Sequence, residues 1–152
     1  MDNQTMQAHL FGSVFLLANH LQLVGDRLDE AITSKQWLLL AVLFKQPNAT
    51  ATLSELASHL GSSRQNVKKM ASILEAKGFL SLRQSEQDRR VVEVHPTQAC
   101  LDHLKGREHA EQQFLTAFYQ GFSDEDLKFM IQLLDRWHRN LHVMESMYAN
   151  EE

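Results

Sequence analysis

The stretch TLSELASHLGSSRQNVKKMASILEAKGFLSLR, residues 52–83, constrains the fold of this chain more than any other. It holds a small residue, Ala57, a glycine four residues later, Gly61, and a branched apolar residue ten positions after the alanine, Val67. The alanine lets two helices cross closely, the glycine permits a sharp turn, and the valine anchors the second helix. This spacing predicts a helix-turn-helix.

Helix start and stop signals delimit the rest of the chain. Capping-box patterns, in which a hydroxyl residue is followed three positions later by Glu, Gln or Asp, occur at Thr33, Thr52, Ser62 and Ser123. Two alternating stretches with SEQD between them predict a strand hairpin. The predicted elements are helices over 6–30, 33–44, 52–60 and 62–77, strands over 79–83 and 91–95, and helices over 96–119 and 123–148, with a loop over 48–51.

A helix-turn-helix followed directly by a hairpin is a winged helix. At about 100° per residue, the second helix of the pair places Val67 and Leu74 on a buried face and presents amides and cations on the opposite face and at its start. Such groups hydrogen-bond base edges and phosphates in a major groove, although exposed charge is more often an ordinary solvated face. The candidate DNA contacts are Ser62, Ser63, Arg64, Gln65, Asn66, Lys68 and Lys69.

Two adjacent arginines, Arg89 and Arg90, stand at the predicted hairpin tip. Narrow minor grooves attract arginine because their negative potential is enhanced. Residues 61–95 carry seven basic and four acidic side chains, within a chain whose net charge is −4. A local positive field inside an acidic chain is compatible with a nucleic-acid partner. The alternative is that both arginines serve only to keep the loop soluble and contact no partner.

From residue 52 to residue 97 the sequence resembles the DNA-binding region of the MarR family of bacterial transcription regulators. That family has an Asp-x-Arg signature in its wing, here Asp88-Arg89-Arg90, and a Leu-Thr pair at the start of the next helix, here Pro96-Thr97. Proline in place of leucine is tolerable at a helix start. The resemblance implies that Arg90 enters a minor groove and that Asp88 braces it.

The resemblance also implies a homodimer formed by the first helix and the last two. Independently, the last predicted helix carries an apolar stripe from Leu127 to Tyr148 that a small chain cannot easily cover alone. The predicted fold class is therefore mainly α with a small β-hairpin wing: a winged helix-turn-helix DNA-binding lobe at 31–95, and a helical dimerisation lobe at 6–30 and 96–148. Packing of these helices within one chain is the alternative.

Three triggers were weighed for such a regulator. A small aromatic or phenolic effector would fit a pocket lined by Phe15, His20, Trp37 and Phe44, although core packing explains each residue singly. The eight histidines include an i, i+4 pair, His138 and His142, without a full metal-ligand set. The single cysteine, Cys100, is more typical of a buried apolar group than of a redox sensor.

The sequence predicts a soluble, cytoplasmic, non-enzymatic protein without cofactor or metal. It has no phosphate loop, nucleophile motif or ligand set. A lone cysteine fits a reducing compartment, the start of the chain lacks the basic region of a secretory signal, and no apolar run is expected to approach the length needed to span a bilayer. The predicted function is a sequence-specific regulator, a repressor relieved by a small ligand, that binds a pseudo-palindromic operator as a dimer. The alternatives are a winged-helix protein-interaction module and a metal- or redox-responsive family member.

Overall fold

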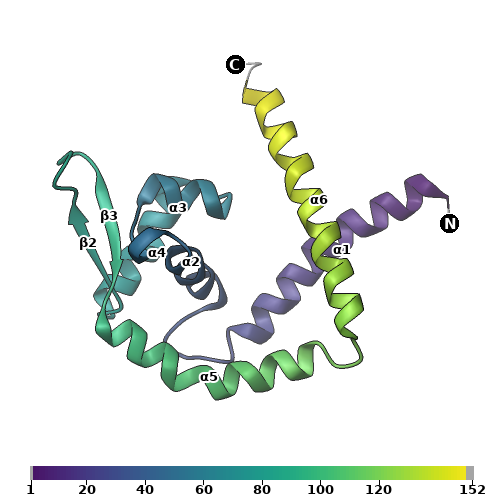
Figure 1. Ribbon diagram of the computed structural model, residues 1–152, viewed down its shortest axis with the longest axis horizontal. Helices are drawn as coiled ribbons and strands as arrows, with labels where there is room; N and C mark the ends of the chain where they lie inside the picture. Colours follow the sequence, from purple (N-terminus) through teal and green to yellow (C-terminus); the bar gives the residue numbers. More distant parts are fainter. Residues whose placement is uncertain (1, 150–152) are drawn as a thin grey trace. The chain divides into compact units, whose positions relative to one another are not determined.

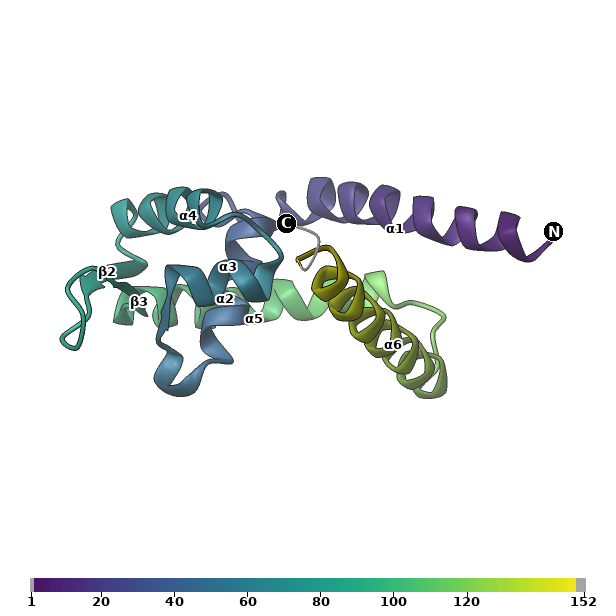
Figure 2. The same cartoon turned by 90° about the horizontal axis from the view of Figure 1, so that it is seen from above.

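The structure, a computed structural model, describes residues 2–149 (Figures 1 and 2). By its internal contacts the chain forms two compact units, one ending at Gln112 and the other starting at Gln113. The first unit contains α1 (Asn3–Gly25), α2 (Ser34–Phe44), a 3-10 turn η1 (Pro47–Ala49), β1 (Ala51–Thr52), α3 (Leu53–Leu60), α4 (Arg64–Ala76), β2 (Leu80–Gln84), β3 (Val92–Pro96) and most of α5 (Gln98–Phe118). The second contains the end of α5 and α6 (Asp124–Ala149).

The fold class is confirmed: a mainly helical chain carries a winged helix-turn-helix made of α3, α4 and the β2–β3 hairpin. The sheet has three strands rather than the predicted two. Its order is β1-β3-β2, all antiparallel, and Val94 at its centre pairs with Ala51 on one side and Leu82 on the other. The segment over 48–51 was predicted as a loop because a two-residue strand leaves no alternating pattern to detect.

The core of the first unit lies between α2, α3, α4 and the sheet. Its largest fully buried side chains are Ile32, Leu39, Leu40, Leu43, Leu53, Leu56, Leu74, Val67, Val94 and Cys100. The run WLLLAVLF in α2 is apolar nearly all round, which predicts a helix buried on all sides, but this prediction is wrong, since Trp37 and Leu38 are 41% and 48% exposed. Only the α2 face with Leu39, Leu40 and Leu43 enters the core, because α3 and α4 cover one side of that helix.

Two capping boxes form as predicted. Thr33 and Gln36 exchange side-chain-to-backbone hydrogen bonds at the start of α2, and Thr52 and Glu55 do the same at the start of α3. The Thr52 amide and hydroxyl both hold the pKa of Glu55 below its ordinary value. The short α3 therefore has its first orphan amide donors satisfied.

The third predicted box is wrong by one residue. The N-cap of α4 is Ser63, whose hydroxyl accepts from the Asn66 amide at 3.1 Å. Ser62 instead closes α3: its amide donates to the Ala57 carbonyl at 3.0 Å, while Gly61 takes a left-handed backbone with φ of 58°. Ser62 is needed to terminate α3, so the following residue, Ser63, caps α4.

Pro96 does not start α5 as predicted. It is the last residue of β3, opposite Leu80, and α5 begins at Gln98. Thr97 takes the capping role, since its hydroxyl accepts from the Cys100 amide at 3.2 Å and donates to the Gly78 carbonyl at 2.6 Å. This junction attaches the start of α5 to the end of the helix-turn-helix.

The first helix, α1, has no buried residue along Asn3–Gly25. It is also long and apolar enough to cross a membrane by length and composition, so the expectation that no segment reaches that length is wrong for α1. The apolar helices of soluble proteins pass the same criterion. Within its own unit, α1 therefore presents a long apolar surface that the rest of that unit does not bury.

The helix α6 is amphipathic, and nearly all of it is exposed. Its start has the predicted reciprocal cap: the Asp126 amide donates to the Ser123 hydroxyl, and the Ser123 amide donates to the Asp126 carboxylate at 2.9 Å. The Ser123 hydroxyl also donates to the Asp126 carboxylate at 2.7 Å, and this bond and the one from the Ser123 amide hold the pKa of Asp126 below its ordinary value. Its exposed large apolar residues are Phe129, Met130, Ile131, Leu133, Leu134, Trp137, Leu141, Val143, Met144, Met147 and Tyr148.

Candidate nucleic-acid interface

The helix α4 presents a polar surface that is anchored from behind. Val67, Ala71 and Leu74 are fully buried along one side of the helix. The predicted contact residues Ser63, Arg64, Gln65, Asn66, Lys68 and Lys69 are all exposed, and Ser62 is half-buried. The apolar face fixes the rotation of the helix about its axis, so the amides and cations at its start point away from the core.

The far end of α4 is bound to the wing. A carboxylate oxygen of Glu75 accepts a hydrogen bond from the Leu82 amide of β2 at 2.8 Å, and the Phe79 amide donates to the Leu74 carbonyl at 2.9 Å. Gly78 supplies the left-handed turn between them, with φ of 80°. These bonds fix the hairpin to the C-terminal end of α4.

The wing tip holds Arg90 against Asp88. The Arg90 amide donates to Asp88 Oδ1 at 2.9 Å, and its guanidinium Nε lies 3.3 Å from the same oxygen. The Arg90 side chain is nonetheless 92% exposed. Arg89 is exposed, and no contact is recorded for its side chain. The carboxylate thus directs the Arg90 side chain while leaving its charge accessible; the DNA roles of these residues remain predictions.

Sequence reasoning missed one residue that shapes this tip. Ser85 is only 5% exposed, unusual for a serine in a hairpin. Its amide donates to the Val91 carbonyl at 2.9 Å, and its hydroxyl bonds to Gln87 on both the side chain and the amide. These bonds close the hairpin before the arginines. The only sequence signal was its place at the end of a strand before a polar turn.

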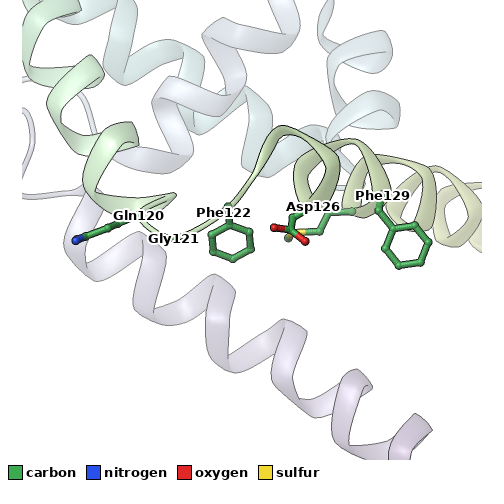
Figure 3. Close-up of a pocket in the computed structure, with 6 residues that line it drawn as sticks. Gln120, Gly121, Phe122, Asp126 and Phe129 are labelled. Carbon is green, nitrogen blue, oxygen red and sulfur yellow. The ribbon is translucent and has the colours of Figure 1, made fainter.

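The four residues predicted to line an effector pocket come from two helices. Phe15 and His20 are exposed on α1, while on α2 Trp37 is exposed and Phe44 is half-buried. The structure has a cavity of about 370 Å³ elsewhere, at the turn between α5 and α6, where Phe122 and Phe129 flank Asp126 (Figure 3). The predicted pocket therefore stays a prediction.

The sensing alternatives find little support in the geometry. Cys100 is fully buried in the core, and burial raises the pKa of its thiol, so the reactive thiolate is disfavoured. Among residues 2–149, no group of three or more His, Cys, Asp or Glu side chains is arranged to hold a metal ion. His142 instead lies 3.4 Å from Glu145 on the exposed face of α6.

These elements define a winged helix-turn-helix protein with exposed cationic side chains on α4 and at the wing tip. Residues 32–92 match the sequence model of the MarR family. The transcriptional repressor MprA of Escherichia coli K12 is 26% identical over 125 residues, which cover 78% of this chain and 71% of the relative. Over residues 32–92 the chain is therefore similar to the MarR family of transcription regulators.

Solved structures agree on the fold. A MarR protein from Peptoclostridium difficile superposes with a TM-score of 0.78 at 20% identity, covering 93% of this chain and 92% of that one. The Staphylococcus aureus protein MepR, solved in a complex with DNA, superposes with a TM-score of 0.74 at 18% identity, covering 89% of this chain and 97% of that one.

Proposed function

We propose that this protein is a homodimeric, sequence-specific DNA-binding repressor. The observation that carries the proposal is the attachment of the wing to α4, with exposed amides and cations on the helix and an exposed Arg90 at the wing tip. In this arrangement α4 reads a major groove and Arg90 enters the adjacent minor groove. The name of MprA as a repressor and the DNA complex of MepR support the same reading.

The proposed dimer rests on uncovered apolar surface. Monomeric soluble proteins rarely expose contiguous apolar patches larger than a few hundred Å². Here α1 and α6 leave long apolar side chains unburied over most of their lengths, and the end of α5 adds Phe118 and Tyr119. A second copy would cover such a surface and place two recognition helices about 34 Å apart, matched to a pseudo-palindromic operator. This also accounts for the apolar length of α1 without a membrane.

Relief of repression by a small aromatic or phenolic molecule is the proposed control. Trp37 on α2 and Phe15 on α1 are 41% and 58% exposed, so both leave a large aromatic surface accessible to a ligand. Phe15 also packs edge-to-face on Phe11 of the same helix, with ring centroids 5.1 Å apart. With His20 and Phe44, Trp37 and Phe15 are the proposed lining of the effector site. A thiol switch at Cys100 is disfavoured by its burial. The proposed compartment is the cytoplasm, where its DNA partner is found in bacteria.

The test is binding to the DNA upstream of the protein's own gene. Fluorescence anisotropy is measured at several salt concentrations against an unrelated duplex of the same length. Tight binding to the upstream DNA, with affinity that falls steeply as salt rises, is expected because phosphate contacts release counterions. Equal affinity for both duplexes, or none at low salt, would contradict the proposal and favour a winged-helix module that binds another protein.

A further inference from the structure

Figure 1 shows the linker between α1 and α2 passing beside α5, and a partly buried ionic cluster joins the two. Asp29 Oδ2 is 2.7 Å from His103 Nε2 and 2.7 Å from Arg107 Nη1, while Asp29 Oδ1 accepts from the Ala31 amide at 2.8 Å. The side chains of Asp29 and Arg107 are only 8% and 10% exposed. Arg107 Nε also lies 2.8 Å from Glu111 Oε1, although the two atoms are poorly aligned for a hydrogen bond.

The same linker is bound to the end of the recognition helix. Lys77, directly after α4, donates from its ammonium group to the Ala31 carbonyl at 2.5 Å. The ring of Phe79, which follows α4, packs on the His103 ring with centroids 4.9 Å apart. Residues 29–31 therefore contact the end of α4 and the middle of α5 at once, and nothing in the DNA-contact surface uses them.

Two separate attachments of α5 to the winged helix follow from this arrangement. The first is at the start of α5, where Thr97 bonds to Gly78 and Cys100 enters the core. The second is at His103 and Arg107, which lie about 10 Å further along the axis from Thr97 and Cys100, at 1.5 Å per residue. A single attachment leaves a helix free to swing about that point, whereas a second attachment one to two turns along fixes its direction.

We infer that Asp29 is a positioning residue for DNA recognition, because it sets the angle between α4 and α5 through His103 and Arg107. The inference rests on the proposed function, in which α5 leads to the second copy of the chain. A fixed angle then sets the separation of the two recognition helices, and so the spacing of the half-sites that the dimer accepts. Asp29 itself touches no DNA in this scheme.

Each variant that should disturb the cluster is paired with a control variant that should leave it intact. Asp29→Asn removes the carboxylate charge that faces Arg107, while Glu30→Gln removes an equal charge from an exposed neighbour on the same linker. His103→Leu removes the donor to Asp29, while His103→Gln retains an amide donor that can bond to the same oxygen. Circular dichroism first establishes that each variant is folded.

The angle is measured without DNA. Spin labels are placed on two exposed positions, Ser72→Cys on α4 and Glu108→Cys on α5, and excess unlabelled protein isolates the distance within one chain. Cys100 is fully buried and stays unlabelled in the native protein. A narrow distance distribution is expected for the parent protein, Glu30→Gln and His103→Gln. A broad or shifted distribution is expected for Asp29→Asn and His103→Leu.

DNA affinity is measured on the same variants with the upstream duplex. Asp29→Asn and His103→Leu are expected to lose roughly tenfold in affinity, the usual size of coupling between distant sites. Equal distance distributions in all variants would overturn the inference, as would loss of fold in both disruptive ones. If the distributions behave as expected but the parent protein binds no DNA, the proposed function falls while the positioning role of Asp29 stands.

Discussion

At the scale of single residues, Arg90 illustrates how a weak interaction contributes to binding. An ion pair with a 92% exposed arginine adds little to folding stability. Its contribution lies in the direction of the side chain, because Asp88 accepts from both the Arg90 amide and its guanidinium. Less rotamer freedom remains to be lost when the arginine enters a groove.

Replacing Arg90 should weaken DNA binding without affecting folding. Arg90→Ala removes the groove contact and is expected to cost about 1–2 kcal/mol of binding free energy, roughly tenfold in affinity. Fluorescence anisotropy gives the affinity, and sedimentation velocity gives the mass. Arg27→Ala removes an equal charge from an exposed site on the α1–α2 linker and should bind normally. A monomeric or unfolded Arg90→Ala protein would show that the arginine is structural.

Asp29 should make stability depend on acid pH. Burial by itself raises the pKa of this carboxyl, but the hydrogen bonds from His103 and Ala31 and the charges of His103 and Arg107 together hold it below its ordinary 3.8. A carboxyl whose pKa is lower in the folded state stabilises the fold fully above about pH 5, and that contribution disappears as the pH falls through the folded-state pKa.

The corresponding measurement is urea unfolding of Asp29→Asn and the parent protein between pH 7 and pH 2. The pair is only partly buried, so its loss should cost less than that of a fully buried pair, about 1–2 kcal/mol near neutral pH. This difference in unfolding free energy between the variant and the parent protein should disappear as the pH approaches 2. If the difference in unfolding free energy did not change with pH, Asp29 would act through packing rather than charge.

At the scale of elements, the sequence predicted those helices and strands whose signals are local. The boxes at Thr33 and Thr52, the turn at Gly61 and the hairpin were all visible as patterns of a few residues. The strand β1 was missed because it exists only through pairing of Ala51 with distant Val94. Pro96 was misplaced for the same reason, since its pairing with Leu80 extends β3 by one residue.

The anchoring of α4 can be tested with neighbouring residues. Leu74 is fully buried and Ile73 is 39% exposed, one position apart in the same helix. Leu74→Ala should lose about 2–5 kcal/mol of unfolding free energy, because it leaves a cavity in the core. Ile73→Ala should change it by about 0.5 kcal/mol or less. Urea denaturation gives both values, and similar losses for the two variants would contradict the assigned orientation of α4.

At the scale of the whole molecule, the candidate site divides into a part the sequence could predict and a part it could not. The exposed residues of α4 follow from helical periodicity, because one helix carries them all. The cluster of Asp29, His103 and Arg107 joins positions more than 70 residues apart, and no pattern along the chain signals it. Contacts of this kind depend on tertiary packing, which a single sequence leaves open.

Assembly is the property of the whole molecule on which the proposed function depends most. An acidic chain repels nucleic acid over most of its surface, so two cationic recognition surfaces acting together provide the affinity that one lacks. The two surfaces remain linked only if the apolar residues of α1 and α6 are covered by the partner. Dimerisation and DNA binding should therefore be lost together.

A single charge on α6 tests this link. Leu134→Glu places a carboxylate in the apolar stripe, where Leu134 is 46% exposed in the isolated chain, and Gln132→Glu adds the same charge at an exposed polar position. Sedimentation velocity should give twice the 17.5 kDa chain mass for the parent protein and Gln132→Glu, and a single chain mass for Leu134→Glu.

Burying an unpaired charge costs several kcal/mol, more than a moderate interface tolerates. Leu134→Glu should also bind the upstream DNA at least tenfold more weakly, about 1.4 kcal/mol. A Leu134→Glu protein that is monomeric but binds as tightly as the parent would show that one recognition surface suffices; a parent protein that is itself monomeric would leave the apolar surface of α6 to a different partner.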